Sequence, residues 1–248
     1  MDKTPLLFIG HGSPMNAIED NEFSREWIRI GQTLPKPAAI VCISAHWQTD
    51  GVNVTADDNP DQIYDFYGFP DELYQMKYPV KGSSAIASLI PEATPDNSWG
   101  IDHGAWSVLA RLFPKADVPV VQLSLDRTKS PAEHFQYAKK LRELRQKNIL
   151  IIGSGNMVHN LGLVQWQNTA YPWAIDFDLN LKKLIETNDV DSLINYQQLE
   201  NSELAIPTNE HYLPLLYILA LKDDDETVKF STEKGTMGSI SMRSLVLQ

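Results

Sequence analysis

The sequence predicts an α/β fold, with one domain over residues 1–248 and a central, mainly parallel or mixed sheet flanked by helices. Three observations lead to this prediction. Short apolar runs that stop at polar or glycine-rich segments recur along the chain and are typical of buried strands. Stretches with helical spacing separate them, an alternation typical of a sheet covered on both faces. A chain of 248 residues with 43% hydrophobic content can bury such a core.

Six apolar runs are predicted to be strands. Four are expected in the centre of the sheet: Leu6–Ile9, Ala39–Ala45, Val118–Leu125 and Ile149–Ile152. Two more, Thr227–Ser231 and Ser239–Val246, are expected to pair with each other near the end of the chain. Because ligands bind outside the carboxyl ends of the strands in such sheets, a functional site is expected at that edge.

Six further stretches have helical spacing. These predicted helices are Asn21–Thr33, Gly82–Ile90, Ala105–Phe113, Pro131–Lys147, Tyr171–Thr187 and Glu210–Leu221. Pro131 suits a first helical turn, where its missing N–H is not needed. The acidic run 223–226 is interpreted as a solvated turn.

Composition excludes several classes of protein. With 21 Lys and Arg against 32 Asp and Glu, the net charge of −11 would repel nucleic acid. The single cysteine, Cys42, lies in an apolar run and excludes disulfides and multi-cysteine metal frameworks. Neither a signal peptide nor an apolar run of about 20 residues is recognisable, so we expect a cytoplasmic protein that does not span a membrane. We expect a monomer or a small homo-oligomer.

Four of the six histidines are predicted to gather at one edge of the sheet. His11 stands between two glycines after the first strand, and His46 ends the second. His159 follows a glycine-rich turn, and His211 opens a helix. Imidazole is the commonest ligand of Zn, Fe and Cu, and the lack of cysteine partners favours an open catalytic site. The spacing alone does not name the metal.

The other two histidines are interpreted differently. His103 lies between glycines and tryptophans ahead of a helix, which suits an acid or base beside the metal, although a histidine that only bonds to the backbone would fit the same place. His134 lies among Glu133, Gln136 and Lys139 and is expected on the surface.

Several motifs together resemble a known family. They are Gly10-His11-Gly12-Ser13-Pro14-Met15, Ser44-Ala45-His46-Trp47, Gly100-Ile101-Asp102-His103-Gly104, Gly153-Ser154-Gly155-Asn156 with Val158-His159-Asn160, and Glu210-His211-Tyr212-Leu213-Pro214-Leu215. In this order, from Leu6 to about Met242, the set resembles the class III extradiol ring-cleavage dioxygenases, and within them the 4,5-DOPA extradiol dioxygenase branch. The motifs are specific as a set, whereas Gly-His-Gly-Ser alone is weak.

The resemblance implies a non-haem Fe(II) enzyme that opens the ring of a DOPA-like catechol with O₂ to give a semialdehyde. It implies His11 and His46 as ligands, with His211 favoured as the third and Glu210 as the alternative, because much of the superfamily uses a glutamate. His159 would be an acid–base group, or a fourth ligand when Zn(II) replaces Fe(II) in purified protein. His103 would hydrogen-bond to the bound dioxygen.

Two other enzyme classes remain open at this point. A zinc hydrolase could use the same histidines to activate water, although the chain contains no His-Glu-x-x-His motif. A tetrapyrrole metal chelatase could also begin with a strand followed by Gly-His-Gly-Ser, but it would not predict the motifs around His46 and His211. A metal-binding protein without turnover is the third possibility.

Overall fold

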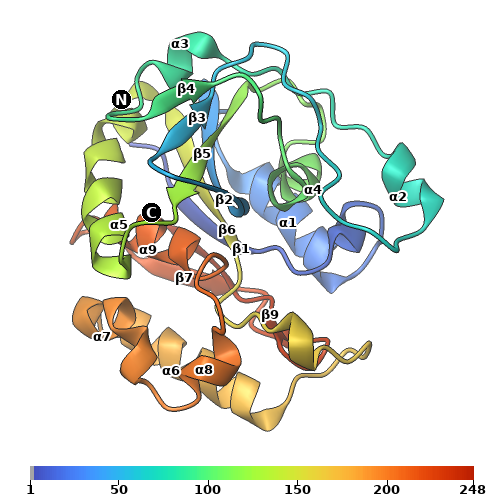
Figure 1. Ribbon diagram of the computed structural model, residues 1–248, viewed down its shortest axis with the longest axis vertical. Coiled ribbons are helices and arrows are strands. Elements are labelled where there is room, and N and C mark those ends of the chain that lie inside the picture. Colours follow the sequence, from blue (N-terminus) through green and yellow to red (C-terminus); the bar gives the residue numbers. More distant parts are fainter. Residues whose placement is uncertain (1–2) are drawn as a thin grey trace.

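The computed structural model describes residues 3–248, and within this range eight strands pair into one mixed sheet (Figure 1). Their order is β4-β3-β5-β2-β6-β1-β10-β7. The strands are β1 (Leu6–Gly10), β2 (Ala39–Thr49), β3 (Asn53–Thr55), β4 (Thr94–Asp96), β5 (Val120–Asp126), β6 (Ile149–Gly155), β7 (Val228–Ser231) and β10 (Ser244–Leu247), and β8 (Gly235–Thr236) pairs separately with β9 (Ile240–Ser241). The four central strands are parallel, and antiparallel pairs flank them. The predicted mixed sheet is confirmed.

Helices cover both faces of this sheet (Figure 1). They are α1 (Glu22–Thr33), α2 (Asp71–Gln75), α3 (Ser84–Ala87), α4 (His103–Leu112), α5 (Pro131–Ala138), α6 (Pro172–Glu186), α7 (Val190–Ile194), α8 (Ser202–Ala205) and α9 (Leu213–Ala220). Within residues 3–248, no helix is both long and apolar enough to cross a bilayer.

The alternation of side chains along the strands builds two separate cores. In β1, Leu6 and Phe8 pack in the core with α5, α6 and α9. Leu7 and Ile9 point to the opposite face and pack in the core with α1 and α4. Since both faces are covered, the central strands are apolar throughout, as their sequence predicts. Cys42 is buried in the second core.

Most predicted elements form, with changes at their ends. Only Ser84–Ala87 of the expected helix 82–90 is helical. The expected helix 131–147 continues after Ala138 as a 3₁₀ helix, Lys139–Lys147. The last expected strand divides into β9 and β10, and β10 pairs with β7 as predicted.

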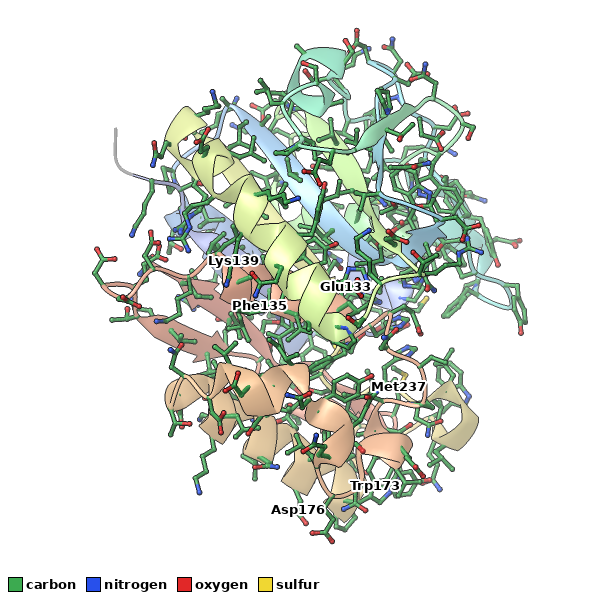
Figure 2. All side chains as sticks on the ribbon, turned by 60° about the vertical axis from the view of Figure 1, so that its left-hand side comes forward. Glu133, Phe135, Lys139, Trp173, Asp176 and Met237 are labelled. Carbon is green, nitrogen blue, oxygen red and sulfur yellow. The ribbon has the colours of Figure 1, made fainter. Side chains whose placement is uncertain are left out.

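His134 is buried, so the prediction that it lies on the surface is wrong. Its Nδ1 lies 3.0 Å from the Tyr217 hydroxyl, because α5 packs against α9 with this side chain facing inward. Glu133 and Lys139, labelled in Figure 2, belong to the exposed side of the same segment. The polar residues around His134 therefore mark the opposite side of the helix.

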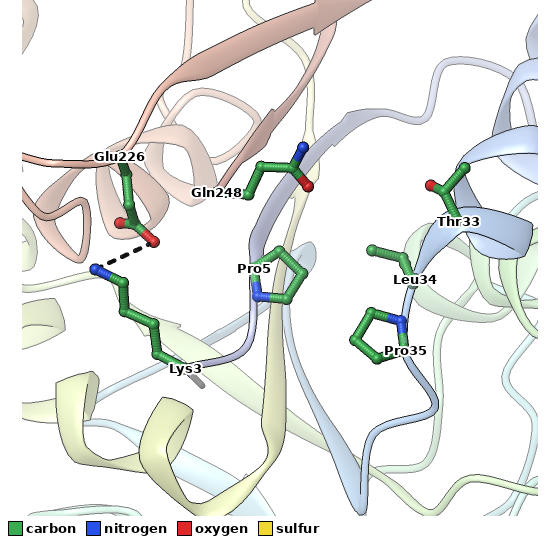
Figure 3. Close-up of a pocket in the computed structure, with 7 residues that line it drawn as sticks. All are labelled: Lys3, Pro5, Thr33, Leu34, Pro35, Glu226 and Gln248. Carbon is green, nitrogen blue, oxygen red and sulfur yellow. Dashed lines mark ion pairs between the residues drawn. The ribbon is translucent and has the colours of Figure 1, made fainter. Parts of the chain in front are cut away.

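The acidic run 223–226 is only partly a solvated turn. Asp225 is exposed, but Glu226 is buried and forms an ion pair with the buried Arg145. Figure 3 shows Glu226 and Lys3 at a cavity of about 310 Å³, where their charged atoms lie 3.8 Å apart. Pro5, which precedes β1, also lines this cavity. The cavity therefore lies at the opposite end of β1 from His11.

Candidate metal centre

Two of the histidines lie on or directly after central strands of the sheet. His11 directly follows β1, and its N–H donates to the Gly155 carbonyl at the end of β6. His46 does not end β2 as predicted, since the strand continues to Thr49. However, the pairing of β2 with β5 shifts register between Ile43 and Gln48, so His46 lies in the irregular part of the strand.

Two glycines allow the close packing that the site requires. A Cβ on Gly155 would lie 2.1 Å from the His211 carbonyl oxygen, and the next residue, Asn156, donates its N–H to that oxygen at 2.8 Å. A Cβ on Gly104 would lie 2.7 Å from Cδ2 of His46. These glycines therefore place the backbone of His211 and the ring of His46.

The rings of His11, His46 and His211 form a nearly equilateral triangle. Their centroids are 5.1, 5.2 and 5.1 Å apart. The Nε2 atoms of His11 and His46 lie 3.2 Å from each other. Two nitrogens bound at about 2.1 Å to one ion, at octahedral or tetrahedral angles, would be roughly 3.0–3.4 Å apart. The observed separation therefore fits ligands of a single metal ion.

The hydrogen bonds of two rings direct their lone pairs into this triangle. Ser154 donates its hydroxyl proton to the Gly104 carbonyl, so its oxygen accepts from Nδ1 of His11 at 3.1 Å. Nδ1 of His211 donates to a carboxylate oxygen of Glu210, also at 3.1 Å. Each Nε2 then carries a lone pair. Within the described residues, the buried Nε2 of His211 has no hydrogen-bond partner, as expected for a nitrogen that serves a metal.

His103 and Asp65 adjoin the triangle. The ring of His103 lies 4.0 Å from that of His46, centroid to centroid. One carboxylate oxygen of Asp65 is 2.9 Å from Nδ1 of His103, and the other is 3.2 Å from Nδ1 of His46. Ligand atoms of His11, His46 and His103 all lie within 4.8 Å of one another.

His159 lies on the other side of the site and stacks on His211. The two ring centroids are 3.4 Å apart and the planes differ by only 7°. Ligand atoms of His159, Glu210 and His211 lie within 4.8 Å of one another. The structure therefore gathers all five histidines that were predicted from the sequence to belong to the site, together with Glu210.

Burial keeps most of these imidazoles neutral. It lowers the pKa of His11, His211 and His103, and it lowers the pKa of His159 to about 3. Burial also acts to lower the pKa of His46, but the carboxylates of Asp65 and Asp102 outweigh it and the pKa is raised. Neutral imidazole is the form that binds metals.

A cavity of about 750 Å³ adjoins the site on the side of Glu210. Its wall is formed by Gln48, Tyr196, Gln197, Ser202, Glu203, Ile206, Pro207, Thr208, Asn209 and Glu210. The cavity is large enough for a substituted aromatic ring and opens to solvent.

Three polar residues of the site were not predicted. Ser154 stands within the motif Gly153-Ser154-Gly155-Asn156, and Asp102 directly precedes His103 in another motif. Asp102 is fully buried and accepts from the Ser44 hydroxyl at 2.7 Å, which fixes the chain just before His46. Asp65 lies in a segment without helical or strand periodicity, so only the folded structure identifies it.

The protein is thus an α/β protein with a histidine-rich candidate metal centre near the carboxyl ends of its strands. Residues 5–247 match the family described as the catalytic LigB subunit of aromatic ring-opening dioxygenase. The chain belongs to this family, and it is an extradiol ring-opening dioxygenase. The resemblance seen in the motifs is confirmed, and the family favours ring opening over the hydrolase and chelatase alternatives.

Individual relatives are similar over most of their length. The 4,5-DOPA dioxygenase extradiol of Escherichia coli (strain K12) is 46% identical, over 98% of this chain and 94% of that protein. The protein of the same name from Beta vulgaris is 37% identical, over 84% of this chain and 83% of its own. The crystal structure of an uncharacterized protein from Escherichia coli K12 has a TM-score of 0.85 at 42% identity, covering 98% of this chain and 99% of that one.

Proposed function

We propose that this dioxygenase uses a non-haem Fe(II) ion held by His11, His46 and His211 to open the ring of a DOPA-like catechol with O₂, which gives a semialdehyde. The observation that carries the proposal is the convergence of three buried ring nitrogens in one triangle. The names of the relatives support a DOPA-like substrate.

The choice of His211 over Glu210 as third ligand rests on their mutual contact. The carboxylate of Glu210 accepts a hydrogen bond from Nδ1 of His211 and from the Thr208 hydroxyl. Glu210 is therefore engaged on the far side of the ring from the unpartnered Nε2. A carboxylate in this place orients the imidazole and makes it a better ligand.

An Fe(II) ion with three protein ligands retains open positions, at which it supplies binding and electron transfer for a catechol and O₂. The protein residues hold both reactants in place and move protons. The cavity beside Glu210 is the route that we propose for the substrate.

His159 is proposed as the acid–base group rather than as a fourth ligand. Its ring is parallel to that of His211 at 3.4 Å, and a metal lies in the plane of an imidazole that binds it. Two parallel planes at this separation cannot both contain one ion. Burial lowers the pKa of His159 to about 3, so the ring is neutral and offers a nitrogen lone pair to a catechol hydroxyl, whose proton it is proposed to accept.

His103 is proposed to face the O₂ substrate from the opposite side. Its ring lies 6.0 Å from that of His11 and 4.0 Å from that of His46. Burial holds this imidazole neutral, so it contributes hydrogen bonding without a fixed charge.

Several broader expectations also remain part of the proposal. We propose one catalytic domain over residues 1–248, because β1 and β10, from the two ends of the chain, pair in the same sheet. We also propose that the protein is cytoplasmic and that it is a monomer or a small homo-oligomer. Zn(II) is expected to compete for the nitrogen-rich site, so protein can be purified in an inactive zinc form.

The test compares metals in the same protein. Apoprotein is loaded anaerobically with Fe(II) or Zn(II), mixed with L-DOPA, and exposed to O₂ while oxygen uptake and visible absorbance are recorded. Uptake with Fe(II) and none with Zn(II) is the expected result. Absence of uptake with Fe(II) over a panel of catechols would overturn the proposal.

The ligands are tested by metal content. His11→Ala and His46→Ala should lose bound metal after dialysis, because each removes one corner of the triangle. His134→Gln is the matched control, since it removes a buried imidazole on α5, outside the site. Full metal content in both ligand variants would contradict the assignment.

A further inference from the structure

A fully buried carboxylate, that of Asp102, lies beside the metal centre at the start of α4. A Cβ on Gly104 would lie 2.7 Å from Cδ2 of His46 and 3.3 Å from Oδ1 of Asp102. These two atoms are therefore at most about 6 Å apart, the sum of the two distances. Cδ2 is bonded to Nε2, the ring nitrogen that faces His11. The carboxylate of Asp102 thus lies close to the proposed metal ligands.

The hydrogen bonds of Asp102 are those of an ionised carboxylate. Oδ1 accepts the backbone N–H of Ala105 at 3.2 Å and the hydroxyl of Ser44 at 2.7 Å. Oδ2 accepts the side-chain NH₂ of Gln122 at 2.5 Å, and the oxygen of that amide accepts the backbone N–H of Asp102, which fixes its orientation. The Ser44 oxygen already accepts the backbone N–H of His46. Neither carboxylate oxygen therefore has an acceptor for a carboxyl proton.

Asp102 differs from the other buried acidic residues because it has no cationic partner. Within residues 3–248, no Lys, Arg or His side chain forms an ion pair with Asp102, whereas the three other buried acidic side chains each have one. These pairs are Asp126–Lys129, Asp178–Arg243 and Glu226–Arg145. A buried charge without a partner is costly, so the position of Asp102 points to a cation that binds nearby.

We infer that Asp102 supplies the buried counter-charge for the divalent metal ion. The three proposed histidine ligands are neutral, so they leave the double charge of the ion uncompensated. A carboxylate that water cannot screen stabilises such a charge over several ångströms. Asp65 and Glu210 also lie near the site, but their side chains are partly exposed. The inference rests on the proposed function, because it assigns a role toward the ion held there.

Asp102→Asn tests the inference, with Asp189→Asn as matched control. Both aspartates cap a helix by accepting the N–H of its third residue, Ala105 in α4 and Ser192 in α7. Zn(II) affinity is measured by competition with a chromophoric chelator. At an effective dielectric constant of about 20, loss of the Asp102 charge should weaken Zn(II) binding at least about tenfold relative to Asp189→Asn. Equal affinities of the two variants would overturn the inference.

Two further readouts separate the charge of Asp102 from a purely structural role. The visible spectrum of Co(II)-loaded protein reports coordination geometry and should be the same in Asp102→Asn and wild type, because no ligand changes. The decrease in log affinity should be about half as large for Cu(I), measured anaerobically, as for Zn(II), because Coulomb energy scales with ionic charge. A changed Co(II) spectrum, or equal decreases for the two ions, would overturn the inference.

A second variant restores both the hydrogen bonds and the charge. In Asp102→Asn the new NH₂ group would face the NH₂ of Gln122, which both donate. In Asp102→Asn/Gln122→Glu, the glutamate can accept from the new side-chain amide and from the backbone N–H of the same residue. The double variant should bind Zn(II) more tightly than Asp102→Asn, and equal or weaker binding would overturn the inference.

The wild-type protein provides a measurement that needs no variant. In Zn(II)-loaded protein with ¹³C-labelled aspartate, the side-chain carbon of Asp102 should show the chemical shift of a carboxylate at neutral pH, and a protonated carboxyl would overturn the inference. Protein that meets these expectations but cleaves no catechol would contradict the proposed substrate class and leave the role of Asp102 standing. Ring opening with equal Zn(II) affinities of Asp102→Asn and Asp189→Asn would do the reverse.

Discussion

Gly155→Ala should displace His211, the proposed third metal ligand, without changing any side chain of the site. The added Cβ would lie 2.1 Å from the His211 carbonyl oxygen and 3.1 Å from its carbonyl carbon. Cβ atoms essentially never approach other heavy atoms closer than 3.0 Å, so the backbone of His211 must move by about 1 Å. A displacement of about 1 Å at a catalytic centre can reduce the rate about 100-fold. Overpacking of this kind also costs about 1–3 kcal/mol of unfolding free energy.

The assay measures kcat/KM for L-DOPA and metal affinity in the same Fe(II)-loaded preparations, with urea unfolding to record stability. Gly162→Ala is the matched control, because the nearest atom to its new Cβ is a side-chain oxygen of Asn160 at 3.2 Å, in an exposed 3₁₀ turn. Gly162→Ala should leave kcat/KM and the metal affinity unchanged within about twofold. If Gly155→Ala kept wild-type metal affinity and kcat/KM, close packing at Gly155 would not position His211.

Three further outcomes follow from named contacts. Burial lowers the pKa of His134 to about 4, against about 6.5 when unfolded, so unfolding takes up a proton below pH 6.5. His134 should contribute a fall of up to about 3 kcal/mol in stability from pH 6.5 to 4, so His134→Gln should make the pH slope in urea titrations shallower by that amount; an unchanged slope would refute it. Glu226→Gln removes the nearer carboxylate partner of the buried Arg145, leaving Asp223 at 3.7 Å, and should cost up to about 3–5 kcal/mol in the same assay; a cost under about 1 kcal/mol would count against it. Glu210→Gln should weaken metal binding about 10–100-fold while His211→Gln abolishes it, and the reverse order would make Glu210 the ligand.

The strand framework and most of the site were readable from the sequence for one physical reason. Buried parallel strands are apolar throughout, so the positions where the runs stop mark the sheet edge at which ligands bind. Two histidines were predicted in this way, because each lies just after an apolar run stops. They are His11, between two glycines, and His159, after a glycine-rich strand end. His211 lies outside the sheet, so its position at the site was predicted only from the motifs that resemble the family.

Asp65, His134 and Glu226 escaped prediction because their environment is made by distant residues. Asp65 reaches the site through the pairing of its segment with Ile101. Glu226 is buried because Arg145, far away in the sequence, lies against it. His134 had a usable signal, because it precedes the buried Ala138 and Leu141 by four and seven positions, which places all three on one helix face.

The incorporation of labelled oxygen tests the central claim most directly. Fe(II)-loaded protein is mixed anaerobically with L-DOPA, exposed to ¹⁸O₂, and the product is analysed by mass spectrometry at early times, before its aldehyde oxygen exchanges with water. An extradiol dioxygenase that works through the His11, His46 and His211 centre should give a ring-opened product that carries two ¹⁸O atoms, and His211→Ala should give none. A product with label only from H₂¹⁸O, or equal labelling by the variant, would contradict the account.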